Sequence, residues 1–484
     1  MTSISRRKFL QSTGLLGAAS VLAACNTSPS SSGGEAGGSE GSTLQWWDHN
    51  GGLQAANKKN FELFKKESGV TVEYTNYQPP KLGEALQLAR QSDQLPDVHS
   101  LAALKLPLPA LIKDGWFQPL QLDDEALSRL PEDALVEGIH IFDGKVYTIP
   151  VFNSRQYWGV TWLNKDMLAA AEVEPPGTYD EFRAAAKAVQ DTAGDDTFGW
   201  IFNFGNTGRV AEIVNYLAQP AGFEGFGGRL FKTGEIEYHH DAYLAVIEFL
   251  LSLQQDGLMF PGSQTLVDQD ARVRWAAGAA GFFFDGPWCT SSVKSDAAEF
   301  LDKVGVAPML VPDSSAERVA YKVIQRGVYH LSASSTMPAE ASQLIGYQTT
   351  EDYYVSIAEA LAQPPLDLSV IDKAETHSAW RTLIDWYGEQ VHLAPEPVVK
   401  NSEVEKVAAQ QKPIQPDLGQ IVAGAFSGDV PDVKAALKEY SDKLTADWEK
   451  SVAAAKKDGA EVELDDYAFP NWKPKQDYTK DMYI

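Results

Sequence analysis

Aromatic side chains occur together with amides and carboxylates at several places where an apolar, strand-like run ends. One such cluster covers residues 46–50 (WWDHN), and another covers 285–288 (DGPW), directly after the apolar run 279–284. Segment 152–158, after a hairpin signal, and segment 200–206, after an apolar stretch, have the same composition. Because α/β sheets place ligand sites at the ends of their strands, these clusters predict a binding site.

The chemistry of these clusters fits a carbohydrate cleft. Sugars present C–H faces that pack on aromatic rings and hydroxyl rims that both donate and accept hydrogen bonds. Asp, Asn, Gln and Arg side chains can satisfy such rims, often with two bonds at a time. From this context we select as candidate ligand contacts Trp47, Tyr77, Arg155, Trp200, Asn203 and Trp288. Arg155 leaves three interpretations open: it binds a ligand carboxylate such as a uronic acid, forks onto neutral hydroxyls, or pairs with a neighbouring acid.

Signatures of several enzyme classes are missing from the sequence. It contains no GxxxxGK[ST] phosphate loop, no GxSxG nucleophile elbow and no HExxH zinc motif. The pair His239-His240, beside Asp241, predicts a helix start and not a metal site. We expect no catalytic residue, no metal and no cofactor, although 66 acidic residues leave paired carboxylates for glycoside hydrolysis open.

The first 25 residues predict export. Arg6, Arg7 and Lys8 precede an apolar run that is too short to span a bilayer, as in a twin-arginine signal peptide covering residues 1–24. The ending LAAC resembles a bacterial lipobox, with Cys25 lipidated. Residues 25–43 are rich in Gly and Ser and predict a flexible linker. We therefore expect a protein anchored by lipid to the outer face of the cytoplasmic membrane.

Composition predicts a folded body of two lobes. About 440 residues follow the linker, which is too many for one hydrophobic core. The formal charge of −25 argues against nucleic-acid binding. If Cys25 carries lipid, Cys289 has no disulfide partner, and we expect it to be a buried thiol.

The order of the predicted elements is that of an α/β protein. A strand at 44–47, a helix that stops at Gly69 and a strand at 70–74 seed a parallel sheet. Further along, Asp143-Gly144 predicts a hairpin, and Thr178 with Glu181 predicts a capped helix start. Additional elements are expected at 83–91, 97–98, 108–112, 159–162, 238–257 and 279–284, with one amphipathic helix from about 431.

Six segments, in order, resemble the carbohydrate-binding family of extracellular solute-binding proteins of bacterial ABC importers, related to maltose-binding protein. The segments are LPDV at 95–98, IKDGWFQPL at 112–120, DGKVYTIP at 143–150 with WLNKDML at 162–168, PGTYDEF at 176–182, 278–288, and VGVAP at 304–308. The resemblance covers nearly the whole chain beyond the linker. Two departures are the absence of arginine in 359–366 and a long, aromatic tail beyond about 450.

The resemblance implies a type II periplasmic-binding-protein-like α/β fold with a ligand cleft between two hinged lobes. It places the N-terminal lobe at 44–150 plus about 306–352, and the C-terminal lobe at about 151–305 plus 353–484. It also implies a sugar ligand, permease subunits with a separate ATPase as partners, and a monomer. Carried over by position, the ligand contacts are Asp48, Asn50, Asn153, Ser154, Tyr157, Asp285 and Trp288.

Two other functions remain open from the residues. A secreted glycoside hydrolase or lyase could use the same aromatic sites with two carboxylates. A solute-binding protein could instead take an amino acid, polyamine or peptide, but Arg155 is the one cation among the selected residues that could hold a carboxylate.

Overall fold

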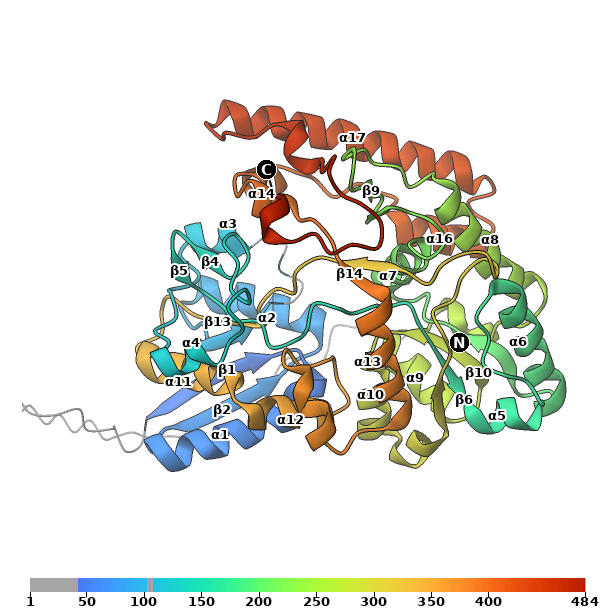
Figure 1. Ribbon diagram of the computed structural model, residues 1–484, viewed down its shortest axis with the longest axis horizontal. Coiled ribbons are helices and arrows are strands. Elements are labelled where there is room, and N and C mark those ends of the chain that lie inside the picture. Colours follow the sequence, from blue (N-terminus) through green and yellow to red (C-terminus); the bar gives the residue numbers. More distant parts are fainter. Residues whose placement is uncertain (1–41, 102–103, 105–107, 484) are drawn as a thin grey trace, which may run out of the picture. The chain divides into compact units, whose positions relative to one another are not determined.

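The computed structural model describes residues 42–101, 104 and 108–483, and contains two four-stranded sheets (Figure 1). The first sheet has the order β13-β3-β1-β2, with strands β1 (Thr43–Asp48), β2 (Thr71–Asn76), β3 (Val98–Ser100) and β13 (Tyr329–Leu331). β1 runs parallel to β2 and β3, whereas β13 is antiparallel to β3. The parallel pairs require crossover helices, and these are α1 (Gln54–Ser68) and α2 (Pro79–Gln91).

The second sheet has the order β11-β6-β10-β7. Its strands are β6 (Val160–Asn164), β7 (Phe198–Ile201), β10 (Ala280–Asp285) and β11 (Val304–Val306). β10 is central, parallel to β7 and antiparallel to β6, and all six of its residues are buried. The carboxyl ends of β7 and β10 therefore meet at one edge of the sheet.

Helices flank both sheets (Figure 1). The helices up to β11 are α3 (Leu108–Lys113), α4 (Asp124–Ser128), α5 (Lys165–Ala170), α6 (Tyr179–Ala193), α7 (Thr207–Ala218), α8 (Asp241–Gln255), α9 (Asp268–Ala276) and α10 (Cys289–Asp296). The later ones are α11 (Pro338–Gly346), α12 (Glu351–Glu359), α13 (Ser378–Gln390), α14 (Pro397–Lys400), α15 (Val404–Ala408), α16 (Leu418–Ser427) and α17 (Val433–Lys457). Short hairpins form from β4 (Ile141–Phe142) with β5 (Lys145–Val146) and from β8 (Gly225–Phe226) with β9 (Arg229–Leu230).

The chain passes between the two sheets three times. It leaves the first sheet before β6, returns to it at β13, and returns to the second where α13 packs against β11. Two of the passages pair as a small parallel sheet of β12 (Ala320–Lys322) and β14 (Val391–Leu393). Two sheets joined by three passages agree with the two hinged lobes that the resemblance implies; the lobe boundaries given above stay a prediction.

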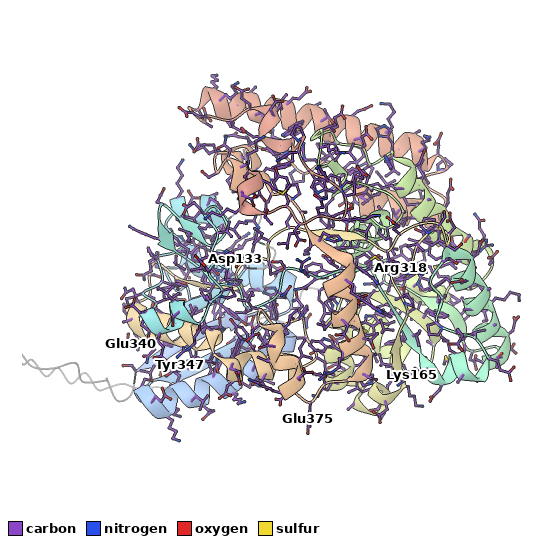
Figure 2. The ribbon with its side chains drawn as sticks, viewed as in Figure 1. Asp133, Lys165, Arg318, Glu340, Tyr347 and Glu375 are labelled. Atoms are coloured by element: carbon purple, nitrogen blue, oxygen red, sulfur yellow. The ribbon has the colours of Figure 1, made fainter. Side chains whose placement is uncertain are left out.

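A continuous apolar core joins the two sheets. Trp46 of β1 and Trp162 of β6 are both buried and belong to one cluster of packed hydrophobic side chains. A second cluster fills the outer face of the second sheet, where Phe182 of α6 packs on Phe282 and Phe284 of β10. Figure 2 shows side chains filling the space between helices and sheets.

Most elements lie where the sequence predicts them. α1 ends at Gly69, whose φ of 76° is left-handed, Thr178 and Glu181 form both bonds of a capping box, and His240 caps α8. Cys289 is buried and free, as expected. The signal peptide, Cys25 and almost all of the linker lie outside the described residues. Within the described part of the chain, no helix is both long and apolar enough to cross a membrane.

Candidate functional site

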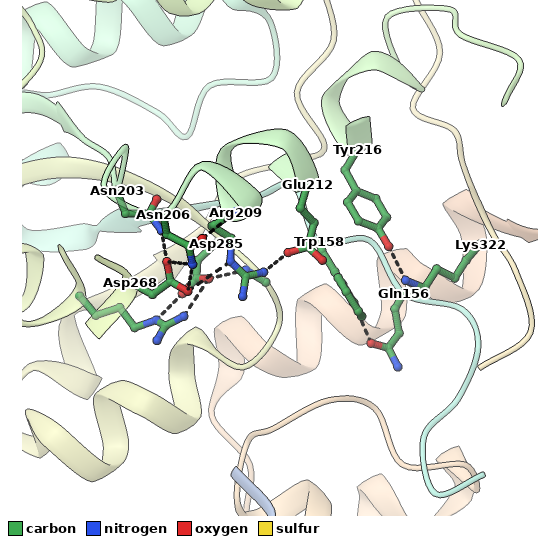
Figure 3. A network of polar contacts seen from close by, with 12 residues as sticks. Gln156, Trp158, Asn203, Asn206, Arg209, Glu212, Tyr216, Asp268, Asp285 and Lys322 are labelled. Atoms are coloured by element: carbon green, nitrogen blue, oxygen red, sulfur yellow. Dashed lines mark hydrogen bonds and ion pairs between the residues drawn. The ribbon is translucent and has the colours of Figure 1, made fainter. Parts of the chain in front are cut away.

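A network of charged and amide side chains lies where β7 and β10 end (Figure 3). Asp285, the last residue of β10, accepts from Arg272 Nε at 2.5 Å and Nη2 at 3.1 Å, and from the Gly286 amide at 2.8 Å. Asn203, two residues after β7, donates to Asp268 of α9. Both strands thus end in side chains that are hydrogen-bonded to α9, which carries Asp268 and Arg272.

Helix α7 adds three polar groups to this cluster. Asn206 caps its N-terminus and donates to both carboxylate oxygens of Asp268 at 3.2 Å. Arg209 pairs with Asp268 at 3.4 Å and with Glu212. Glu212 lies three residues after Arg209, and Tyr216 follows one turn later, so all three lie on one face of the helix.

Two tryptophans border the network. The rings of Trp158 and Trp288 meet edge to face, with centroids 5.0 Å apart and an interplanar angle of 74°. Trp158 Nε1 donates to Gln156 Oε1 at 3.0 Å, which fixes the ring. The Arg209 guanidinium lies 4.8 Å from the Trp288 centroid, and the Lys322 ammonium lies 3.5 Å from that of Trp158. Both indoles are partly exposed.

The charges of the site balance. Arg209, Arg272 and Lys322 are cations, and Glu212, Asp268 and Asp285 are carboxylates. Burial raises the pKa of Glu212, although Arg209 and Lys322 oppose the shift. Burial also lowers the pKa of Lys322 to about 8, against attraction by Glu212 and Glu396. Three groups of each sign in one cluster favour a neutral ligand over a charged one.

The first sheet presents a buried carboxylate at the same type of strand end. Asp48, the last residue of β1, is fully buried and accepts from Tyr74 Oη and Tyr329 Oη at 3.0 Å each and from Asn57 Nδ2 at 3.3 Å. The Asn50 amide and side chain both bond to its other oxygen, at 2.9 and 3.2 Å. Asp48 therefore fixes the loop that carries Asn50.

That loop approaches the second sheet's site. A Cβ added to Gly52 would lie 3.2 Å from Ser291 Oγ of α10 and 3.0 Å from the Ala362 Cβ. Such contacts are tight for a real side chain, so glycine permits the close approach. The loop after β1 and the helix that begins after Trp288 thus lie against each other.

The family to which this chain belongs follows from comparison with known proteins. The model of the bacterial extracellular solute-binding proteins matches residues 59–383, which is more than half of the chain. The chain belongs to this family. This solute-binding protein is also 25% identical over 232 residues to a binding protein of Brucella abortus (strain 2308) and to one of Brucella suis biovar 1 (strain 1330). The match spans 47% of the chain and 50% of each relative, so the chain spans about half the length of these curated relatives.

Solved structures show the same fold. The GacH receptor of Streptomyces glaucescens GLA.O has a TM-score of 0.60 at 19% identity, covering 84% of this chain and 98% of the receptor. A solute-binding protein of Thermotoga lettingae TMO has a TM-score of 0.63 at 18% identity, covering 84% and 100%. The maltotriose-binding protein of Thermus thermophilus has a TM-score of 0.60 at 18% identity, with the same coverage. The predicted family and the predicted two-lobe fold are thereby confirmed.

Four of the predicted contacts lie at the edges of the solute-binding protein's two strand-end sites. Asn203, Asp285 and Trp288 belong to the network in Figure 3 or border it. Asn50 lies on the approaching loop of the first sheet. Beside it, the rings of Trp47 and Tyr77 pack together at 5.3 Å and are partly exposed. Their roles as ligand contacts stay a prediction.

Residues 153–155 form hydrogen bonds with the passages between the sheets and with the C-terminal tail. Asn153 donates to the Leu366 carbonyl at 3.4 Å, and Ser154 Oγ accepts from the Gln325 amide at 2.9 Å. Arg155 donates to the Val391 carbonyl at 2.6 Å and forks onto Asp477 of the tail. Of the three interpretations of Arg155, the structure agrees with the third, in which Arg155 pairs with a neighbouring acid.

Tyr157 and Trp200 are core residues in this structure. Tyr157 is 2% exposed and its ring meets Tyr216 edge to face at 5.7 Å. Trp200 has no exposed surface and stacks on Phe202 at 5.2 Å. A ring without an exposed face offers no surface to a sugar in this conformation, so neither residue is counted as part of the site.

Two hollows of the described surface lie away from the residues labelled in Figure 3. A groove of about 460 Å³ runs along α1 and β2, between Lys58, Glu62 and Asn76, and none of the predicted contacts lines it. A cavity of about 10 Å³ beside Tyr157 and Leu383 has room for one water molecule at most. In the part of the chain that the structure describes, no group of three His, Cys, Asp or Glu side chains is placed to hold a metal ion.

Sequence reasoning missed more of the network than it found. The missed residues are Gln156, Trp158, Asn206, Arg209, Glu212, Tyr216, Asp268, Arg272 and Lys322. A signal was available for α7, because Arg209, Glu212 and Tyr216 follow the cap Asn206 at helical spacing. Trp158 belongs to the segment 152–158 that the sequence analysis names as a candidate cluster, but it is not among the selected contacts.

Proposed function

We propose that this protein is the substrate-binding component of an ABC importer and that it binds a neutral mono- or oligosaccharide between its two lobes. The observation that carries the proposal is the pair of partly exposed indoles, Trp158 and Trp288, beside a charge-balanced network of carboxylates, amides and cations. Aromatic faces pack on the C–H faces of a sugar, and the network supplies acceptors and donors for its hydroxyls. The approach of the Asn50 loop to α10 supplies a second wall from the first sheet.

The neighbours' ligands support a sugar. The structures named above were solved with acarbose, with α-D-tagatose and with maltotriose. Binding without bond cleavage is the matching mechanism. Contacts from both lobes favour the closed conformation by their differential affinity, and the permease recognises that conformation.

A thermal-shift screen of the purified protein tests the proposal. The panel contains maltotriose, raffinose, laminaribiose, D-tagatose, uronic acids, amino acids and polyamines. A neutral sugar bound with micromolar affinity and supplied at millimolar concentration should add about 4 kcal/mol to the free energy of unfolding. We expect a raised midpoint with a neutral sugar that is recovered intact. Recovery of cleaved sugar would instead indicate an enzyme, and a shift with amino acids or polyamines alone would change the ligand class.

The anchor is part of the proposal. Residues 1–24 would direct export by the twin-arginine route, Cys25 would carry the lipid, and the linker would hold the lobes outside the cytoplasmic membrane. Labelled fatty acid should be incorporated into the wild-type chain and not into Cys25→Ser. Equal labelling of both chains would contradict the assignment of Cys25.

A further inference from the structure

Lys322 is a buried cation that forms no ion pair with any described carboxylate. It ends β12, in the passage between the lobes, and is 9% exposed. Among the described residues no carboxylate oxygen lies within 4.0 Å of its ammonium, and its one described hydrogen bond goes to Tyr216 Oη. A lysine has three donors, so two are without a protein acceptor in the described part of the chain. The Trp158 ring, 3.5 Å from the ammonium, offsets part of the cost of burying the charge, and a ligand or water can complete the remaining hydrogen bonds.

Glu212 presents the complementary group. It lies one helical turn before Tyr216 on α7, and its side chain is 27% exposed. Arg209 donates to Oε2, whereas Oε1 has no hydrogen bond to any residue that the structure describes. Tyr216, which accepts from the Lys322 ammonium, lies one turn after Glu212 on the same face of α7, so the two charged side chains lie near each other. Figure 3 shows them on either side of Trp158.

We propose that Lys322 and Glu212 together recognise a pair of neighbouring hydroxyls on the sugar, with Lys322 donating to one and Glu212 accepting from the other. This inference rests on the proposed function and names the part of the ligand that Lys322 and Glu212 recognise. A vicinal diol supplies both an acceptor and a donor, as the two side chains require. It also leaves the balance of three cations and three carboxylates unchanged, whereas a ligand carboxylate would add a charge beside Glu212, Asp268 and Asp285.

The position of Lys322 gives this contact a second consequence. β12 pairs with β14 in the small sheet that joins the lobes, while Glu212 and Tyr216 belong to the second lobe. A sugar held by both groups therefore ties the hinge to one wall of the site. Such a contact contributes to closure because it forms fully only when the hinge strand and α7 are in this arrangement.

The test is calorimetric titration of the full chain with maltotriose, raffinose, laminaribiose, D-tagatose and D-glucuronic acid. Lys322→Met keeps the aliphatic stem and removes the donors, Glu212→Gln removes the charge, and Lys187→Met alters an exposed lysine on α6 as the matched control. For a neutral sugar that binds the wild type, we expect Kd to rise about 10- to 100-fold in Lys322→Met and Glu212→Gln. We expect Lys187→Met to leave it unchanged.

A second measurement uses only the wild type and is independent of how the variants fold. Between pH 6.5 and 9.5, we expect the affinity for the same sugar to fall as pH rises above about 8, where Lys322 loses its proton. The groups facing Lys322 are Glu212 and Tyr216 of α7 and Glu396 after β14, and Arg326 pairs with Glu396. The pKa of Tyr216 is raised by burial, so Tyr216 stays neutral over this range.

The outcomes separate the inference from the function on which it rests. A wild type that binds a neutral sugar, with an unchanged Kd in Lys322→Met and a flat pH profile, would overturn the inference and leave the proposed function intact. Binding of D-glucuronic acid alone, lost in Lys322→Met, would replace the diol by a carboxylate. A wild type that binds none of the five compounds would overturn both.

Discussion

Asp48 shows how a single residue can prepare a binding site from within the core. A buried carboxylate is stable only when its oxygens are hydrogen-bonded, and five donors from Asn50, Asn57, Tyr74 and Tyr329 surround this one. The donors come from the loop after β1 and from α1, β2 and β13, so Asp48 joins the elements of the first sheet at the carboxyl end of β1. Its role is to position the Asn50 loop.

Asp48→Ala should therefore destabilise the protein strongly. The substitution leaves several buried donors without an acceptor, which should lower the free energy of unfolding by about 3 kcal/mol or more. Urea unfolding measures the change, and Glu375→Ala, which removes an exposed carboxylate, is the control. A loss below 1 kcal/mol, comparable to that of the control, would contradict the role assigned to Asp48.

Residue types at strand ends could be read from the sequence, but their burial could not. Strand-end context selects Asn203 and Trp288, the family resemblance selects Asp48 and Asp285, and three of these four residues lie in or beside the network. Trp200 is selected by its context and is part of the core, because it lies within β7, where Gly199, Trp200 and Ile201 are all buried and both faces of the strand are covered. Lys322 lies more than 100 residues from Tyr216 and Trp158, and no local pattern brings them together.

At the scale of elements, the C-terminal tail fastens the hinge. Phe469 donates its amide to the Phe231 carbonyl at 2.9 Å, and Tyr478 donates its amide to the Leu393 carbonyl at 2.8 Å. Between these two residues, Asp477 accepts a hydrogen bond from Arg155, which lies in the first passage. It also accepts one from the Leu393 amide, in the third passage, at 2.9 Å. The sequence showed the tail's aromatic composition, but its partners depend on tertiary contacts with residues 84 to 322 positions away.

Asp477→Asn should weaken the contact between the tail and the passages that contain Arg155 and Leu393. The paired side chains are 29% and 27% exposed, so we expect a loss of about 1–2 kcal/mol in the free energy of unfolding. Asp481→Asn, exposed on the same tail, is the control and should have no measurable effect. Identical midpoints for the wild type and Asp477→Asn would contradict the assignment.

The Arg155–Asp477 pair also predicts how the free energy of unfolding changes at acidic pH. Burial alone would raise the pKa of Asp477, but hydrogen bonds from Arg155 and the Leu393 amide outweigh burial and lower it. A carboxyl group whose pKa is lowered by folding contributes stability above its unfolded-state pKa of 3.8, and that contribution is lost as pH falls through the lower folded-state value. The difference in stability between wild type and Asp477→Asn should therefore be full at pH 6 and shrink below pH 3.8. A difference that persists unchanged at pH 2.5 would contradict this.

At the scale of the whole molecule, two four-stranded sheets are joined by three passages of the chain. The sequence predicted this class of fold well, because strand–helix–strand order, caps and turns are local signals, and the family's segments recur in order. The prediction could not say which residues meet between the lobes, because that depends on how the passages and tail fix them. Closure follows from a ligand that contacts both lobes more favourably when they approach.

The central claim is that a neutral sugar binds, uncleaved, at the indole pair beside the charged network. The most direct test is calorimetric titration of wild type and Trp288→Ala with the sugar that gives the largest thermal shift, followed by recovery of that sugar. The account predicts one site per chain, intact sugar, and a Kd about 30-fold weaker in Trp288→Ala, with folding confirmed by circular dichroism. Equal affinity in the two proteins would place the sugar elsewhere, and cleaved sugar would contradict the function itself.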